Sequence, residues 1–155
     1  MRVALAGPMG SGKSTVGRIL AARWGAPFLD LDATLGDIPA LFAAEGEAGF
    51  RARERAALAR AVQGEGVLAL GGGTVVLAEN RALLAGWQVF VLTAPAATLR
   101  ARVGVGEGRP LAGHLEALLE ERREAYRAAG PLVDTDGIAP DAVADRLEAL
   151  CSPPP

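Results

Sequence analysis

A glycine-rich loop close to the N-terminus limits the folds open to this chain more than any other feature. Residues 7–14 read Gly-Pro-Met-Gly-Ser-Gly-Lys-Ser, which fits G-x-x-x-x-G-K-[ST], a pattern whose backbone N–H groups surround the phosphates of a nucleoside triphosphate. We expect an apolar strand before the loop, at Val3–Ala6, and a helix after it, at Ser14–Trp24. A helix start presents free N–H groups and a positive dipole end to an anion. This setting favours a phosphate site over a glycine turn that only resembles one.

Lys13 is the only lysine of the chain, and the other strongly basic residues are all arginine. A compact ammonium can stand between two phosphates as a point charge, whereas the planar guanidinium is bulkier and binds as a fork. We therefore expect Lys13 to bridge the β- and γ-phosphates of ATP and the Ser14 hydroxyl to ligate Mg²⁺. The residues predicted to hold the phosphates are Gly10, Ser11, Gly12, Lys13, Ser14 and Thr15.

The composition predicts one globular domain over residues 1–150 with a disordered tail over 151–155, because 155 residues suffice for a single core and 50% are hydrophobic. A net charge of -2 argues against nucleic acid and acidic membrane surfaces. No apolar run reaches the roughly 18 residues of a membrane span, and the N-terminus does not read as a signal peptide. The single cysteine, Cys151, excludes an internal disulfide and fits a reducing compartment. We expect a cytoplasmic monomer.

Strands and helices alternate along the chain, which predicts a three-layer α/β/α fold around a five-stranded parallel sheet. The expected strands are Val3–Ala6, Pro27–Leu31, Val67–Leu70, Trp87–Leu92 and a short one from Leu132. The expected helices are Ser14–Trp24, Phe50–Gln63, Asn80–Leu84, Ala96–Val103, His114–Ala128 and Asp141–Leu150. Ligands of such sheets bind beyond the carboxyl ends of the strands, where Gly7, Asp30, Asp32 and Gly71 stand.

Two carboxylates, Asp30 and Asp32, end the second expected strand. Alternation along a strand sends both side chains to the same side, so we expect them near the phosphate loop. One would hold a magnesium-bound water and the other an acceptor hydroxyl; the alternative is a cap on the following helix. Three glycines, Gly71–Gly73, follow the third strand and predict either a ligand-facing loop or a plain turn.

The segment of about residues 104–114 is rich in glycine around Arg109-Pro110. This is typical of a flexible lid that brings an arginine to a phosphoryl group, with a surface loop as the alternative. Helical spacing alone does not separate functional from solvated arginines among Arg51, Arg122, Arg123 and Arg127.

Taken in order, these motifs resemble the shikimate kinase family over nearly the whole chain. The resemblance rests on the loop at 7–15, Phe28-Leu29-Asp30-Leu31-Asp32, Phe42 followed by Glu45-Gly46-Glu47, Phe50-Arg51-Ala52-Arg53-Glu54, Leu70-Gly71-Gly72-Gly73-Thr74, Arg109-Pro110-Leu111 and Tyr126-Arg127. The segment between Asp32 and Phe42 is shorter than usual in that family, and the proline that often precedes its Tyr-Arg pair is absent.

The resemblance implies the fold of the nucleoside-monophosphate kinases with a flexible lid, and Mg²⁺-dependent transfer of phosphate from ATP to shikimate, giving 3-phosphoshikimate for the biosynthesis of chorismate and aromatic amino acids. By the same resemblance, Lys13, Asp32 and Arg109 would be catalytic. Asp30 would reach the metal through water, and Arg102 and Pro140 would border the adenine. Shikimate would be bound by Asp32, Arg51, Gly72, Gly73 and Arg127, with the two arginines on its carboxylate.

Three alternatives stay open. Another small-molecule kinase of this architecture, such as gluconate kinase, would share loop and lid but need a different acceptor pocket. Adenylate kinase is disfavoured because the chain has no Asp-Gly-Phe-Pro-Arg segment. A nucleotide-binding module without catalysis should have lost Asp32 or Arg109, and both are present.

Overall fold

A parallel sheet of five strands forms the centre of the computed structural model, which describes residues 1–104 and 114–151. The strand order is β2-β3-β1-β4-β5. The strands are β1 (Arg2–Ala6), β2 (Phe28–Asp30), β3 (Gly66–Ala69), β4 (Gln88–Thr93) and β5 (Leu132–Asp134). In the central strand, Val3 pairs with Val67 of β3 and with Gln88 of β4. The predicted α/β class is confirmed.

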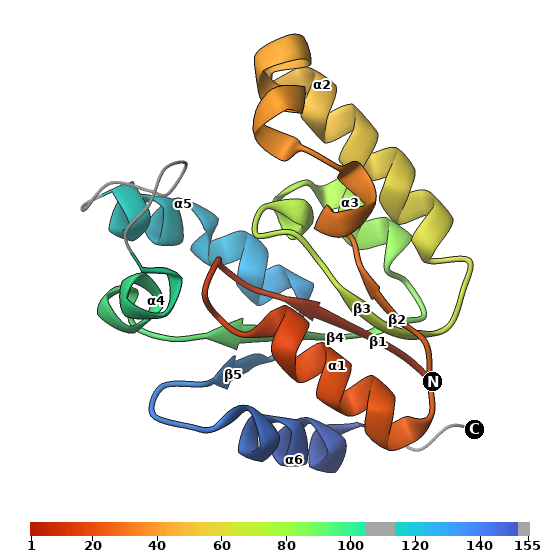
Figure 1. Cartoon of the computed structure of the whole chain (residues 1–155), viewed down its shortest axis with the longest axis vertical. Helices are drawn as coiled ribbons and strands as arrows, with labels where there is room; N and C mark the ends of the chain where they lie inside the picture. Colours follow the sequence, from red (N-terminus) through yellow and green to blue (C-terminus); the bar gives the residue numbers. More distant parts are fainter. Residues whose placement is uncertain (105–113, 152–155) are drawn as a thin grey trace.

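Helices cover both faces of this sheet (Figure 1). They are α1 (Lys13–Trp24), α2 (Ile38–Ala61), α3 (Ala78–Leu83), α4 (Ala96–Val103), α5 (His114–Ala129) and α6 (Pro140–Leu150), with short 3-10 helices η1 (Asp32–Leu35) and η2 (Thr74–Val76). Helices α1 and α6 lie on one face, and α2, α3 and α5 on the other (Figure 1). None of the helices in the described part of the chain is long and apolar enough to cross a membrane.

The central strand divides its side chains between two cores. Val3 and Leu5 pack with residues of α1 and α6, whereas Ala4 and Ala6 pack with residues of α2 and α5. This division follows from the alternation of side chains along a strand. Because both faces are covered, β1 and β3 are buried and read as continuous apolar runs.

Helix α2 differs most from the expectation, since it begins at Ile38 rather than at Phe50. Its start is fixed by Asp37, whose side chain accepts a hydrogen bond of 3.1 Å from the backbone N–H of Ala40. The helix bends at Gly46, which has φ 69° and ψ -175°. Apolar Ile38, Leu41 and Phe42 stand at helical spacing in this half, but the stretch is short and mostly exposed, and the expected helix did not include it.

The second strand also ends earlier than expected, at Asp30. Asp32 therefore begins η1, and the strand alternation that was expected to align the two carboxylates does not operate. A turn brings them together instead, because the backbone N–H of Asp32 donates to Asp30 Oδ1 at 3.1 Å. The remaining predicted elements match the observed ones to within a few residues.

Candidate active site

The loop between β1 and α1 is built for a closely approaching ligand. Gly7, Gly10 and Gly12 have φ of 131°, 81° and 97°, a region that L side chains rarely adopt. A Cβ on Gly7 would lie 2.2 Å from the carbonyl oxygen of Leu92, so backbone passes backbone without room for a side chain. Helix α1 then begins without a side-chain cap, which leaves its first N–H groups to an anion.

The Lys13 ammonium lies over this loop. Its Nζ donates to the carbonyl oxygens of Gly7 at 2.7 Å and Pro8 at 3.0 Å. Burial lowers the pKa of Lys13 to about 8, an effect that Asp32 and Asp30 oppose. The ammonium is thus held over the phosphate loop by two carbonyl oxygens, close to the carboxylates of Asp30 and Asp32.

Ser14 and Asp30 form a pair of oxygen ligands at the start of α1. Ser14 Oγ donates to Asp30 Oδ2 at 2.7 Å. A hydroxyl next to a carboxylate is the oxygen donor set that Mg²⁺ takes from protein beside substrate phosphates. Within the described residues no group of three His, Cys, Asp or Glu side chains could hold a metal.

A pocket of about 280 Å³ opens beside the phosphate loop, between α2, α5 and the three glycines. Its polar lining groups are the Asp32 carboxylate, the Arg51–Glu54 pair, Arg122 and the Tyr126 hydroxyl. Two carboxylates and two guanidinium groups therefore line a single cavity next to the phosphate loop, and one carboxylate, that of Glu54, is paired with Arg51. Such a cavity suits a small polar molecule that carries both a hydroxyl and an anionic group.

Gly71 and Gly73 are required by space rather than by backbone conformation, since neither has a positive φ, whereas a Cβ on Gly72 would come no closer than 3.6 Å to any atom. A Cβ on Gly71 would lie 2.7 Å from Asp32 Oδ1. A Cβ on Gly73 would lie 2.7 Å from Arg51 Nη2 and 3.1 Å from Arg122 Nη2. The loop therefore faces the pocket, and two guanidinium groups converge on the same point of it.

Arg51 is oriented by a buried carboxylate. Its Nη1 donates to Glu54 Oε1 at 2.8 Å, and Glu54 is only 1% exposed. The other oxygen, Glu54 Oε2, accepts a hydrogen bond of 2.9 Å from Thr74 Oγ1. A buried carboxylate with both oxygens in use fixes its partner, so Arg51 is held toward the pocket.

Arg127 does not fit the position expected for it. It is exposed on α5 and is not among the residues that line the pocket, whereas Arg122 lines it. Five residues advance the side chain by roughly 140° around a helix, so the two arginines leave α5 on different sides. The signal that points to Arg122 is its spacing of four from the buried Tyr126, which puts both on one helix face.

Asp32 lines the pocket beside the phosphate loop. Burial raises the pKa of this carboxyl, the nearby Asp30 raises it further, and Lys13 opposes the shift. The capping alternative is not supported, because η1 has no side-chain cap and α2 is capped by Asp37. Asp32 is thus a carboxylate within reach of a ligand.

A second cavity, of about 390 Å³, lies at the other side of the loop. It joins the sequence-predicted nucleotide residues Gly10, Ser11, Gly12, Thr15, Arg102 and Pro140. Arg102 is tied to the loop after β5, donating to Thr135 Oγ1 at 2.9 Å and to the Thr135 carbonyl at 2.6 Å. Arg109 lies outside the described residues, as does most of the segment expected to form a lid.

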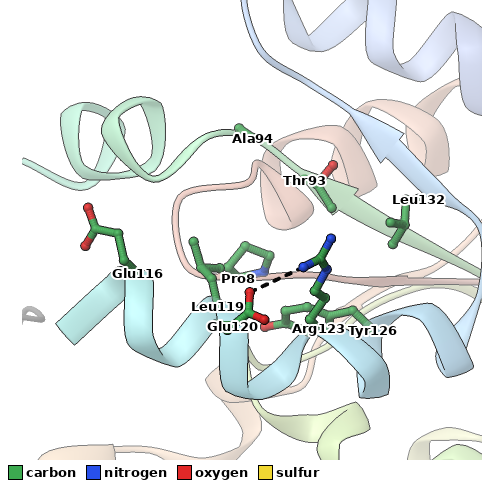
Figure 2. A pocket seen from close by; sticks show the side chains of 9 residues that line it. All are labelled: Pro8, Thr93, Ala94, Glu116, Leu119, Glu120, Arg123, Tyr126 and Leu132. Atoms are coloured by element: carbon green, nitrogen blue, oxygen red, sulfur yellow. Dashed lines mark ion pairs between the residues drawn. The ribbon is translucent and has the colours of Figure 1, made fainter. Parts of the chain in front are cut away.

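A further groove lies on the opposite side of α5 and is shown in Figure 2. Glu120 and Arg123 form an ion pair of 3.5 Å at its edge. No residue predicted from the sequence to bind a ligand lines this groove. Leu119 and Tyr126 line both it and the acceptor-side pocket, so α5 forms the wall between them.

Known proteins are similar in sequence to this chain over nearly its whole length. A sequence model described as "Shikimate kinase" matches residues 9–151. A shikimate kinase of Salinispora tropica is 46% identical over 94% of this chain and 95% of its own length. One of Frankia casuarinae is 45% identical over 97% of this chain and 72% of its own length.

Solved structures agree with the sequence relatives. The shikimate kinase from Acinetobacter baumannii in complex with shikimate has a TM-score of 0.88 and 36% identity, covering 96% of this chain and 90% of its own. A gluconokinase from Sinorhizobium meliloti, at TM-score 0.66 and 21% identity, covers 96% of this chain and 94% of its own, and it shares the fold alone. Because the family model matches residues 9–151 and relatives 45–46% identical cover 94–97% of the chain, the chain belongs to the shikimate kinase family.

Proposed function

We propose that this chain transfers the γ-phosphoryl group of ATP to a hydroxyl of shikimate, giving 3-phosphoshikimate and ADP. The observation that carries the proposal is the pocket beside Lys13, in which Asp32 faces the guanidinium groups of Arg51 and Arg122. Membership of the shikimate kinase family supports the same reaction, as does the shikimate complex of the Acinetobacter baumannii relative.

Shikimate carries a carboxylate and ring hydroxyls, and the pocket has a partner for each. Arg51 and Arg122 bind the carboxylate, since both approach Gly73 and guanidinium forks suit carboxylates. Backbone N–H groups near Gly72 and Gly73 bind a ring hydroxyl. Asp32 accepts a hydrogen bond from the hydroxyl that is phosphorylated. In this proposal Arg122 takes the role that the resemblance to the family implied for Arg127.

ATP binds along the phosphate loop. The amides of residues 10–15 and the Lys13 ammonium hold its phosphates, and Arg102 and Pro140 border the adenine, lining the second cavity. Ser14 would hold Mg²⁺ directly, and Asp30 would hold it through water. When bound, this ion neutralises charge on the phosphates.

The transfer itself needs alignment and charge compensation more than covalent chemistry. The hydroxyl oxygen bonds to the γ-phosphorus while the bond to the bridging oxygen of ADP breaks, through a loose transition state. Asp32 orients the hydroxyl and takes its proton, and Lys13 compensates charge on the transferred group. Arg109 is proposed from the sequence alone to add a second positive charge there.

A coupled assay of ADP release tests the reaction against its rivals. With shikimate, gluconate, AMP or no acceptor, we expect ADP release with shikimate only. ADP release with gluconate but not shikimate would identify a different sugar-acid kinase. No release with any acceptor would favour a nucleotide-binding module without catalysis.

Replacement of Arg122 by alanine should raise the KM for shikimate roughly 30- to 150-fold, because a charge-assisted pair contributes about 2–3 kcal/mol. The KM for ATP should change little. The matched control is Arg127→Ala on the same helix, which should leave both constants unchanged. A large rise in the shikimate KM for Arg127→Ala alone would restore the original assignment.

The pH dependence of ATP use should reflect Lys13, whose pKa is lowered to about 8. Below this value the ammonium is charged and attracts phosphate. Above it the free enzyme has lost the proton, so kcat/KM for ATP should fall by up to about tenfold per pH unit. Arg122 is one of the groups that lower this pKa, so Arg122→Ala should move the decline to higher pH. Rates at saturating shikimate between pH 6 and 10 measure both effects, and a flat profile would contradict them.

We also propose that the chain acts as a cytoplasmic monomer with one domain over residues 1–150. The two cavities lie on either side of the phosphate loop, so the residues proposed to bind ATP and the acceptor belong to one domain. The free thiol of Cys151 fits a reducing compartment.

A further inference from the structure

The bend in α2 divides this helix into an outer segment, Ile38–Glu45, and an inner segment that continues to Ala61. The bend depends on the backbone of Gly46, because its φ of 69° disfavours any side chain. Space is not the reason, since a Cβ on Gly46 would meet nothing within 4 Å. The outer segment therefore has its own direction, which neighbouring contacts must fix.

An ion pair joins the two segments across the bend. Arg53 Nε donates to Glu45 Oε2 and Arg53 Nη2 to Glu45 Oε1, each at 2.6 Å. The partners are eight positions apart, whereas side chains meet along a straight helix at spacings of three or four. In a straight helix they would be about 12 Å apart along the axis. The bidentate contact thus belongs to the bent form of α2.

A second glycine makes room for this pair. A Cβ on Gly49 would lie 2.4 Å from Glu45 Cβ, so the Glu45 side chain passes directly over the backbone of the inner segment. The contact also lowers the pKa of Glu45 and raises that of Arg53, in both cases through their hydrogen bonds. The bend, the free space at Gly49 and the charge pair form one local arrangement.

The outer segment reaches the acceptor pocket. Ile38 lines the pocket directly, and so do Phe50 and Arg51 of the inner segment. Phe42 contacts Phe50 with ring centroids 4.6 Å apart, and the Arg51 guanidinium lies 5.2 Å from the centre of the Phe50 ring. A change in the direction of the outer segment would therefore move Ile38 and loosen the ring that supports Arg51.

We propose that the Glu45–Arg53 ion pair is a latch that fixes the bend of α2 and so positions Ile38, Phe50 and Arg51 around the acceptor. Both partners are positioning residues, since they line neither cavity described above. Exposed ion pairs generally contribute little to stability. This one acts on an equilibrium between two helix directions, because only the bent form makes the contact. The inference rests on the proposed function, in which shikimate is the acceptor.

The test compares Glu45→Ala, Arg53→Ala and the charge reversal Glu45→Arg/Arg53→Glu. Each single variant should raise the KM for shikimate about three- to fivefold, the scale of a favourable exposed bidentate pair. The KM for ATP and kcat should stay within about twofold, because the phosphate loop is untouched. The charge reversal should restore the shikimate KM. Because salt also screens the contacts of Arg51 and Arg122 with the shikimate carboxylate, 0.5 M salt should raise the KM of every form, but by a larger factor in the parent than in the single variants.

Two further measurements keep the outcomes distinct. Arg23→Ala is the matched control, since it removes exposed ion pairs between α1 and α6, and its shikimate KM should not change. Amide hydrogen exchange in residues 38–49 should be faster in both single variants than in the parent. Unchanged shikimate KM and exchange in the single variants, or a raised KM that charge reversal fails to lower, would overturn the latch. A parent protein that does not phosphorylate shikimate would instead refute the proposed function.

Discussion

Replacement of Lys13 by alanine should lower kcat by about a thousandfold, at the upper end of what one charged contact to a transition state contributes. Lys13 is the only lysine, and its Nζ reaches two carbonyl oxygens of the phosphate loop, so no neighbouring ammonium can replace it. Stopped assays at saturating ATP and shikimate measure the loss.

The fold should survive this change. Burial lowers the pKa of Lys13, so the charged form is less favourable in the folded protein than in the unfolded chain, and its removal should not reduce the melting temperature at pH 7. Lys13→Arg is the control that keeps the charge but changes its shape; it too should turn over slowly. Turnover within tenfold of the parent in Lys13→Ala would remove Lys13 from the mechanism.

Replacement of Asp32 by asparagine should reduce kcat by roughly 10²- to 10⁴-fold, the range for a lost general base. The amide can still contact the acceptor hydroxyl but cannot take its proton. Because burial and the charge of Asp30 raise the pKa of this carboxyl, the neutral amide should be tolerated without loss of stability. Shikimate binding, measured by calorimetry, should weaken far less than turnover.

Asp37→Asn provides the comparison for Asp32→Asn. Asp37 caps α2, and asparagine caps a helix nearly as well, so this variant should keep parental turnover. Wild-type activity of Asp32→Asn would show that Asp32 only shapes the turn after β2.

The sequence was informative where local chemistry and fold depend on the same residues. The phosphate loop needs glycine for its backbone angles and lysine for its charge, so a short motif defined both the site and the strand–helix unit around it. The apolar runs of β1 and β3 likewise predicted a covered parallel sheet, because burial on both faces leaves no polar positions.

Sequence-based prediction failed where the position of a residue depends on its tertiary contacts. The outer half of α2 carries apolar Ile38, Leu41 and Phe42 at helical spacing, and Asp37 and Pro39 are start signals, but the stretch is short and Gly46 interrupts it, so the helix start was missed. Arg122 and Arg127 lie on two sides of α5, and the Tyr126-Arg127 motif by itself does not show which side faces the pocket. The glycines at 71–73 are equally compatible with a plain turn. The sequence does not show whether a glycine is needed for its backbone angles or because a neighbouring group leaves no room for a side chain.

Gly7 and Gly73 differ in what a larger side chain would displace. An added methyl group at Gly7 would press on the main chain at Leu92, which cannot retreat. At Gly73 it would press on the tips of two long arginine side chains, and those can swing aside. A change at the first position costs the protein its architecture, whereas one at the second leaves a well-folded molecule that no longer grips its acceptor. Gly7 thus keeps the protein folded, whereas Gly73 keeps it able to bind its acceptor.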